Sequence, residues 1–435
     1  MIRRMTAPAP SLWRNRSFML LLSGETASTF LAAFLHVALP AIAVTTLLAS
    51  DFQVGLLGAS ESVAFLFLTL PAGAWVDRLS RRRVMIAANL VRACLVALIP
   101  IVWAFGVLSI PWLLWIVFGL GVCRVFFDVA YMSILPTLVS RAELTNANSR
   151  LQATFEVANA AGPSVAGPLV GAFSAPVAPL LSVGGFLASA FTTWRIREPV
   201  VPRTVTKRDL GGEIREGLDF VRHHPLISRV VYSAMLSNLF GGLTFTMFPV
   251  LILRQFAFGT TGLGFLMTIG SLGALTGALA GPVFVRRLGD GHAIPIAALI
   301  EGVAGFGVPA SLLVPHAWAF ATLAASNFVM LMGIVAFNIA QVSLRQRVCP
   351  ERLLGRMNAT IRFAVWGVNP IASLLSGTIA ALIGLQNLFW IGATGAMLAI
   401  LILVFSPLWG LKKVDSYDES AATAEALSEV PPPVL

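Results

Sequence analysis

The 435-residue sequence predicts an all-α membrane protein with twelve transmembrane helices in two bundles of six. Apolar residues make up 57% of the chain and charged residues only 11%, with a mean hydropathy of +0.84. Soluble domains carry about 25% charged residues. The apolar residues fall in runs near the roughly 20 residues that a helix needs to cross a bilayer. Because backbone polar groups in lipid must be satisfied within the chain, these runs are expected to be helical.

Hydrophobic runs and their breaks give twelve expected spans. The first run is too long for the core of a signal peptide, so we expect it to remain as a helix that is tilted or has turns outside the membrane. The first six spans are 17–47, 54–76, 84–106, 111–135, 151–173 and 177–195. The second six are 228–253, 261–285, 292–314, 317–343, 360–383 and 387–408.

Lysine and arginine gather in alternate loops. Of the 30, 22 fall within 3–16, 78–83, 195–229, 345–356 and 412–413, whereas the opposite loops contain only Arg254. The positive-inside rule therefore predicts a multi-pass protein of the inner (plasma) membrane with both termini in the cytoplasm. Since topology explains the net charge of +10, no nucleic-acid partner is expected.

The charge pattern and the spans together define five segments. In the central connector, Ile214, Leu218 and Val221 recur at helical spacing, which favours an amphipathic helix on the membrane surface over an unstructured linker. The acidic end of the chain reads as a disordered tail. The segments are a cytoplasmic N-terminus (1–16), a six-helix bundle (17–195), a cytoplasmic linker (196–227), a second six-helix bundle (228–408) and a cytoplasmic tail (409–435).

The two halves match at an offset of 210 residues, which indicates a parallel duplication. Such repeats place a substrate site between the halves near the middle of the membrane. The matched pairs are Leu144 with Leu354, Asn148 with Asn358, Asn159 with Asn369, and Gly167 with Gly377.

Three stretches resemble motifs of the major facilitator superfamily. The run Gly73 to Arg83 (GAWVDRLSRRR) resembles its motif A, with Ser80 where the family often has glycine. The run Gly162 to Gly167 (GPSVAG) resembles the antiporter motif C, with Ala166 in place of a glycine. The loop 345–359 looks like that of a narrower branch, which holds enterobactin exporters and macrolide-efflux-type proteins. The resemblance covers all twelve spans.

The resemblance to motif A implies a conformational latch, in which Arg81 bridges Asp77 to Asp128 of the fourth span. Asp77 and Arg81 have the i, i+4 spacing that places two residues on one helix face, and Gly73 permits close helix approach. Asp128 has two alternative roles, a proton carrier or a residue neutralised by its partners. The expected latch comprises Gly73, Asp77, Arg78, Arg81 and Asp128.

The motif C residues Gly162, Pro163 and Gly167 tolerate a kink and close packing in the fifth span. Plain helix packing and a gating role are both open for them.

Ionisable residues inside the spans are candidates for function, because burying a charge in lipid is costly. Glu25 leads, since Ser28, Thr29 and His36 continue a polar stripe along its helix. Arg92 is expected to snorkel to the cytoplasmic interface, and Glu301 has no evident partner in the sequence. The proton-coupling candidates are Glu25, Glu61, Arg124 and Glu156.

The resemblance also implies that spans 1, 4, 7 and 10 line a central cavity. Asn327 and Asn338 are eleven residues apart and so share one helix face. A mostly apolar wall with a few polar groups suits an amphiphilic cargo. The cavity candidates are Ser28, Thr29, His36, Ser237, Asn238, Asn327 and Asn338.

The sequence therefore predicts a monomeric secondary active transporter that exports a small amphiphilic molecule by proton antiport with alternating access. A siderophore, a macrolide or another drug-like compound would fit. We expect no enzyme activity, catalytic residue, cofactor or metal, since the chain has no phosphate-binding loop and its three cysteines, Cys94, Cys123 and Cys349, are scattered. An uptake symporter or facilitator of the same fold is the alternative. A polytopic enzyme or sensor is more distant, because the five histidines are dispersed.

Overall fold

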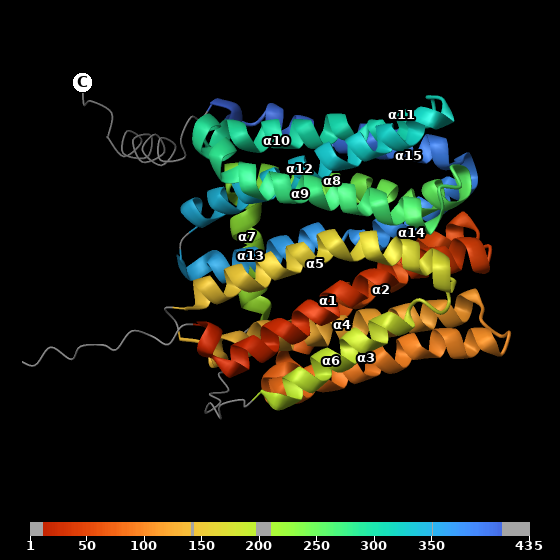
Figure 1. Cartoon of the computed structure of the whole chain (residues 1–435). Helices are drawn as coiled ribbons and strands as arrows, with labels where there is room; N and C mark the ends of the chain where they lie inside the picture. Colours follow the sequence, from red (N-terminus) through yellow and green to blue (C-terminus); the bar gives the residue numbers. More distant parts are fainter. Residues whose placement is uncertain (1–11, 141–142, 197–209, 350, 411–435) are drawn as a thin grey trace, which may run out of the picture. The chain divides into compact units, whose positions relative to one another are not determined.

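The computed structural model describes residues 12–140, 143–196, 210–349 and 351–410, which form helices and contain no strand (Figure 1). Within this part of the chain, ten helical segments are long and apolar enough to cross a membrane. The all-α membrane fold is confirmed, whereas the count of twelve spans stays a prediction. Two expected spans are missing from these ten. The helix α5 is rich in small and polar residues, and α6 has only 16 residues.

The first half of the chain forms six helices with side-chain caps at several starts. Asn15 accepts a hydrogen bond from the Phe18 amide, and Ser50 forms a capping box with Gln53. Such caps satisfy amide groups that a helix start leaves unpaired. The helices are α1 (Arg16–Ala41), α2 (Asp51–Arg78), α3 (Arg81–Ala104), α4 (Ile110–Leu138), α5 (Leu144–Phe173) and α6 (Leu180–Arg195).

The end of α2 corrects one expectation about motif A. This helix stops at Arg78, Leu79 is extended, and Ser80 caps the next helix, so that Arg81 is the first residue of α3. Asp77 and Arg81 therefore lie on two different helices. The i, i+4 spacing does not place them on one face.

The second half splits two of the expected spans. The run 292–314 becomes most of α10 and all of α11. The run 360–383 becomes the end of α13 and all of α14. Pro370 at the start of α14 has no amide hydrogen to continue the preceding helix. The helices are α7 (Leu210–His223), α8 (Pro225–Val250), α9 (Gly259–Leu288), α10 (Asp290–Gly305), α11 (Gly307–Ala310), α12 (His316–Val348), α13 (Glu351–Trp366), α14 (Asn369–Ile383) and α15 (Leu385–Val404).

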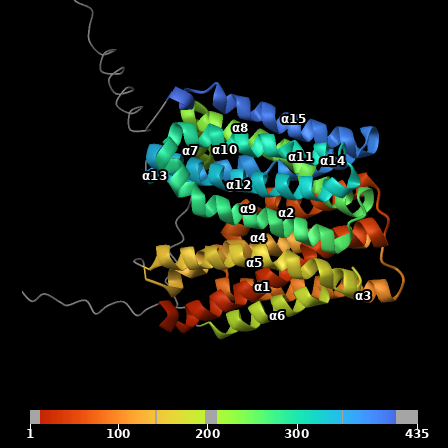
Figure 2. The same cartoon turned by 45° about the horizontal axis from the view of Figure 1, so that its top comes forward.

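Contacts divide the chain into two compact units. The first is Met1–Thr206 with Pro249–Thr268, and the second is Lys207–Phe248 with Ile269–Leu435. In the first unit α1 packs between α5 and α6, α2 packs on α4, and α3 packs on α4 and α6 (Figures 1 and 2). In the second unit α10 packs on α12 and α15. Each unit has an apolar core, which includes Phe18, Met85 and Ile134 in the first and Leu226, Ile294 and Leu403 in the second.

Two π-helical segments in the first unit support the duplication. One is η2 (Ile42–Thr46), which follows Pro40, and the other is η3 (Leu251–Gln255), which follows Pro249. Each is followed by a residue with positive φ, Leu48 at 48° and Ala257 at 55°. The offset between the two segments is nearly that of the sequence matches. The same helix ending is thus built twice.

The two π-helical segments contact each other, and an ion pair reinforces this contact. Arg254 Nη1 lies 2.6 Å from Asp51 Oδ1, and its Nη2 donates to the Ala49 carbonyl oxygen. Arg254, the basic residue that stands apart in the loop pattern, is therefore paired at the start of α2.

The linker helix α7 lies against α13. An added Cβ at Gly217 would lie 2.7 Å from Thr360 Oγ1, Glu216 forms an ion pair with Arg356, and Val221 is buried. Leu218 is half exposed, and the side chain of Ile214 lies outside the described residues. The expected amphipathic helix exists, but its buried face contacts a neighbouring helix where we had expected lipid.

We expect Arg254→Gln to lower the free energy of unfolding by about 1 kcal/mol, because it removes a charge-assisted hydrogen bond that solvent partly screens. The apparent melting temperature of the purified protein in detergent measures the effect. Asp51→Asn serves as the second arm of a double-mutant cycle. If the effects of the two substitutions simply add, the ion pair contributes nothing.

Candidate functional site

Ionisable side chains of four helices gather in the first unit. We call this group the charged cluster, and its centre is Arg124 of α4. Arg124 Nη1 lies 3.6 Å from Glu61 Oε1, and its Nε lies 3.9 Å from Asp128 Oδ2. The cluster comprises Glu25 and His36 of α1, Glu61 of α2, Arg92 of α3, and Arg124 and Asp128 of α4.

Glycine brings α2 and α4 close enough for this arrangement. An added Cβ at Gly121 would collide with the carbonyl oxygen of Glu61. Only a residue without a side chain lets the two backbones approach so closely. Because Arg124 follows Gly121 by one turn, the contact sets Arg124 beside the Glu61 carboxylate.

Glu25 is the most enclosed acid of the cluster. Its Oε2 is buried and has no hydrogen-bond partner among the described residues, while Thr29 bonds to the carboxyl group. The charged groups that interact with it are Arg92, Asp128 and Arg124. Its neighbour Gly24 packs directly on Thr192 of α6, where a Cβ would collide. Close packing thus fixes the backbone that carries this carboxyl group.

Arg92 lies in the middle of α3, so the expectation that it snorkels to the interface is wrong. Its guanidinium carbon lies 4.5 Å from the centre of the Phe186 ring and 5.4 Å from that of Phe127. Its Nη1 donates to Asn89 Oδ1 at 3.3 Å, and Asn89 Nδ2 donates to Ser189 Oγ at 2.9 Å. The side chain is held inside the unit.

The cluster has an open side and an enclosed side. The side chains of Glu61, Arg124 and Asp128 are 45%, 49% and 56% exposed, and His36 is exposed as well. Glu25 and Arg92 are less exposed. A proton could therefore pass between an accessible group and an enclosed carboxyl group within one connected set of charges.

Two other predicted residues of the first unit have separate surroundings. Glu156 on α5 accepts a hydrogen bond from Gln152 Nε2 at 2.7 Å. Ser28 is buried at 4% exposure, whereas Thr29 belongs to the surroundings of Glu25. The structure thus brings Glu25, Glu61 and Arg124 together and links Glu156 to a neutral side chain.

The polar candidates of the second unit differ in exposure. Ser237 and Asn238 on α8 are partly exposed, and Asn238 Nδ2 donates to the Ala234 carbonyl oxygen at 2.9 Å. Asn327 is 9% exposed and contacts Gly270 of α9, while Asn338 is exposed and accepts from Gln341 at 2.6 Å. The shared face of α12 is covered at Asn327 and open at Asn338.

Glu301 also belongs to the second unit, on α10. Its carboxyl group is buried and has no charged partner among the described residues. Its backbone contacts the position of Gly333 on α12. The environment is unlike that of Glu25, which has arginines nearby.

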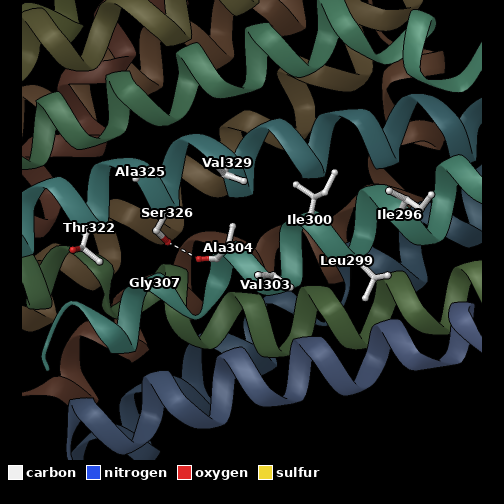
Figure 3. Close-up of a pocket in the computed structure, with 10 residues that line it drawn as sticks. All are labelled: Ile296, Leu299, Ile300, Val303, Ala304, Gly307, Thr322, Ala325, Ser326 and Val329. Carbon is white, nitrogen blue, oxygen red and sulfur yellow. Dashed lines mark hydrogen bonds between the residues drawn. The ribbon is translucent and has the colours of Figure 1, made fainter. Parts of the chain in front are cut away.

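An apolar groove of about 750 Å³ runs along the second unit between α10 and α12 (Figure 3). The hydroxyl of Ser326 donates to the Ala304 carbonyl oxygen at 2.7 Å, so its polar group is already satisfied. The sequence did not indicate this groove, because its lining is ordinary for a membrane helix. The lining residues are Ile296, Leu299, Ile300, Val303, Ala304, Gly307, Thr322, Ala325, Ser326 and Val329.

The latch expected from motif A stays a prediction. The surroundings of Gly73 and the side chains of Asp77 and Arg78 lie outside the described residues. Near them, Trp75 of α2 stacks on Phe126 of α4 with ring centres 5.9 Å apart. This stacking holds the end of α2 against the part of α4 that carries Asp128.

The motif C residues make close backbone contacts within the first unit. A Cβ at Gly162 would collide with Ala33 of α1, and one at Gly167 would lie 2.7 Å from the Thr260 carbonyl oxygen and 3.0 Å from Gly264 Cα. The carbonyl oxygen of Pro163 also faces Gly264 of α9. These contacts agree with a packing role, and the gating role is untested.

A polytopic helical protein with paired charges inside its membrane-spanning helices has the features of a secondary transporter. Residues 7–431 match the family described as transmembrane secretion effector, within the major facilitator superfamily. The chain belongs to this family and is an efflux transporter.

Individual relatives agree with this assignment. The chain is 28% identical to the multidrug efflux pump Tap of Mycolicibacterium fortuitum, over 82% of this chain and 88% of that protein. It is 21% identical to macrolide efflux protein A of Streptococcus pyogenes, over 79% and 84% of the two chains. A mutant of the nucleoside transporter NupG has a similar fold, with a TM-score of 0.75, 13% identity and coverage of 89% and 99%.

We expect Gly167→Ala to destabilise the protein by about 1–3 kcal/mol, because the new methyl group meets backbone atoms that cannot move aside easily. The control is Gly184→Ala on α6, where a Cβ meets nothing within 4 Å and alanine should be neutral or stabilising. Apparent melting temperatures of the two variants in detergent provide the comparison. Equal shifts for both would contradict the packing role.

Proposed function

We propose that this transporter exports a small amphiphilic organic molecule by proton antiport, with Glu25 as the proton carrier. The observation that carries the proposal is the charged cluster, in which an enclosed carboxyl group connects to accessible acids and arginines. In a purely structural set of ion pairs, every carboxylate would keep a partner during the whole transport cycle. Here Glu25 Oε2 has no hydrogen-bond partner among the described residues, so a proton on it would be accommodated.

The class of cargo rests on the relatives and on the composition of the helices. Two relatives are named for multidrug and macrolide efflux. Apolar walls with a few polar groups, such as Ser237, Asn238 and Asn338, suit molecules that have both apolar and polar parts. We therefore infer a drug-like cargo.

The coupling would work through exchange of partners around Arg124. With Glu25 protonated, the remaining charges of the cluster balance, and the site can change its access from one side of the membrane to the other. When Glu25 releases its proton on the cytoplasmic side, its negative charge must be balanced by Arg92 and Arg124. Cargo and proton would bias the two access states in opposite directions, which is the requirement for exchange.

The organisation of the chain follows from the loop charges. We propose an inner-membrane monomer with two six-helix bundles, 17–195 and 228–408, a cytoplasmic linker (196–227), and cytoplasmic ends (1–16 and 409–435). Asp128, Arg81 and the motif A residues would then act as a latch on the cytoplasmic side. Since the family and the relatives are transporters, we propose that the cargo leaves chemically unchanged.

We expect Glu25→Gln to reduce proton-driven export at least about tenfold while cargo binding is kept, because the amide keeps the shape but cannot exchange a proton. Purified protein in liposomes with an imposed pH gradient, loaded with a macrolide, provides the measurement. Glu143→Gln is the matched control, since Glu143 is bonded to Ser140 before the start of α5. Undiminished proton-driven export by the Glu25 variant would remove Glu25 from the mechanism.

The topology makes a separate prediction. In a variant whose Cys94, Cys123 and Cys349 are replaced by serine, Arg222→Cys should react with an impermeant thiol reagent only in inverted vesicles, because residue 222 is exposed on α7. In the same background, Val107→Cys should react only in intact spheroplasts, because residue 107 is exposed between α3 and α4. The reverse pattern would overturn the proposed orientation.

A further inference from the structure

Arg92 is a charged residue that the expected cavity does not require. It lies on α3, whereas the resemblance implies a cavity lined by spans 1, 4, 7 and 10. A guanidinium group in the middle of a membrane-spanning helix is costly unless other groups balance it. The Arg92 side chain is therefore a candidate for a functional role.

The contacts of the Arg92 side chain come from its own helix α3 and from α4 and α6. The rings of Phe127 and Phe186, from α4 and α6, lie near the guanidinium group at distances typical of cation–π pairs. Asn89 accepts from it and is itself anchored to Ser189. Asn89 and Ser189 are 0% and 2% exposed. A side chain supported in this way keeps one position.

The titratable groups that act electrostatically on Arg92 are two acids, one base and one weakly acidic side chain. The acids are Glu25 of α1 and Asp128 of α4, and the base is Arg124 of α4. The weakly acidic group is Cys123 of α4, whereas Tyr131 of α4 interacts with Glu25 and Asp128. Beyond them, Glu61 of α2 and His36 of α1 interact with Arg124. The helix α6 contributes Phe186 and the hydroxyl of Ser189.

These charges leave an imbalance of one. The cluster has three carboxyl groups, of Glu25, Glu61 and Asp128, and two guanidinium groups, of Arg92 and Arg124. With His36 neutral, a single proton makes the whole cluster neutral. A second proton would leave it with an excess positive charge in the middle of the membrane, which is unfavourable.

Gly24, which precedes Glu25, packs on Ser189, so the Ser189–Asn89–Arg92 chain of hydrogen bonds starts beside Glu25. We propose that Arg92 is a positioning residue of the coupling site, a fixed counter-charge that balances the Glu25 carboxyl group and limits the cluster to one exchangeable proton per transport cycle. The inference rests on the proposed proton antiport. The inference gives the two arginines different roles. Arg92 is fixed between two aromatic rings, whereas the half-exposed Arg124 can change partners.

Removal of the Arg92 charge tests the inference. In Arg92→Gln the cluster keeps three acids and one arginine, so it should hold an additional proton and release it only at higher pH. We expect the pH of half-maximal export in liposomes to rise by about one unit or more, with a changed ratio of protons to cargo. Arg92→Lys keeps the charge, so its pH profile should stay near that of the unchanged protein. The control is Arg195→Gln, because Arg195 also lies over a phenylalanine, Phe191, at 4.7 Å, but is exposed at the end of α6.

A stability measurement covers the case in which Arg92→Gln folds poorly. If the damage comes from acids left without their counter-charge, the double variant Arg92→Gln with Glu25→Gln should melt at a higher temperature than Arg92→Gln alone. Simple addition of the two effects would overturn the inference.

The outcomes separate the two proposals. Suppose that the wild-type protein exchanges protons for cargo but that Arg92→Gln leaves the pH profile and the proton-to-cargo ratio unchanged. That result contradicts the role of Arg92 and leaves the proposed antiport standing. Macrolide export without any proton flux in the unchanged protein overturns the proposed antiport, and the role of Arg92 with it.

Discussion

The cost of placing ionised side chains in hydrocarbon governs this structure more than any other interaction. An isolated charge in the middle of a membrane helix is strongly unfavourable, so charges persist there only in groups that balance one another. The first unit contains such a group, and each member depends on the rest. Arg124 holds two acids at 3.6 and 3.9 Å, while Arg92 is near Glu25 and Asp128. The balance is close to complete, and the small remainder is what a proton can supply.

Close helix packing makes that balance possible, and glycine makes the packing possible. Gly121 lets α4 contact the backbone of α2 at Glu61, and Gly24 lets α1 contact α6 beside Glu25. In lipid the hydrophobic effect does not drive helices together, so association depends on such shape-matched contacts. The glycines thus set the distances at which the charged groups meet. Packing and electrostatics are parts of one arrangement.

Sequence reasoning predicted the fold class, the family and most members of the charged cluster, because apolar runs, loop charges and lone acids in spans are strong local signals. It placed Arg92 wrongly, since the rings of Phe127 and Phe186 that hold it come from distant parts of the chain. It also read Asp77 and Arg81 as one helix face, because spacing does not reveal the break at Leu79 and Ser80. The burial of Asn327 against Gly270 likewise depends on a neighbouring helix.

The duplicated helix endings have a consequence for how this protein can diversify. Both repeats contain a proline and a π-helical segment, whereas the charged cluster lies in the first unit. When Gly281 is aligned with Gly73 and Arg286 with Arg78, Val285 stands where the first half has Asp77. The two halves thus share a backbone feature and differ in the charges inside their helices. Under the proposed antiport, the groups that exchange the proton lie in the first unit, so substitutions in the second copy leave them in place. In this arrangement, the choice of cargo could change through substitutions in one half alone.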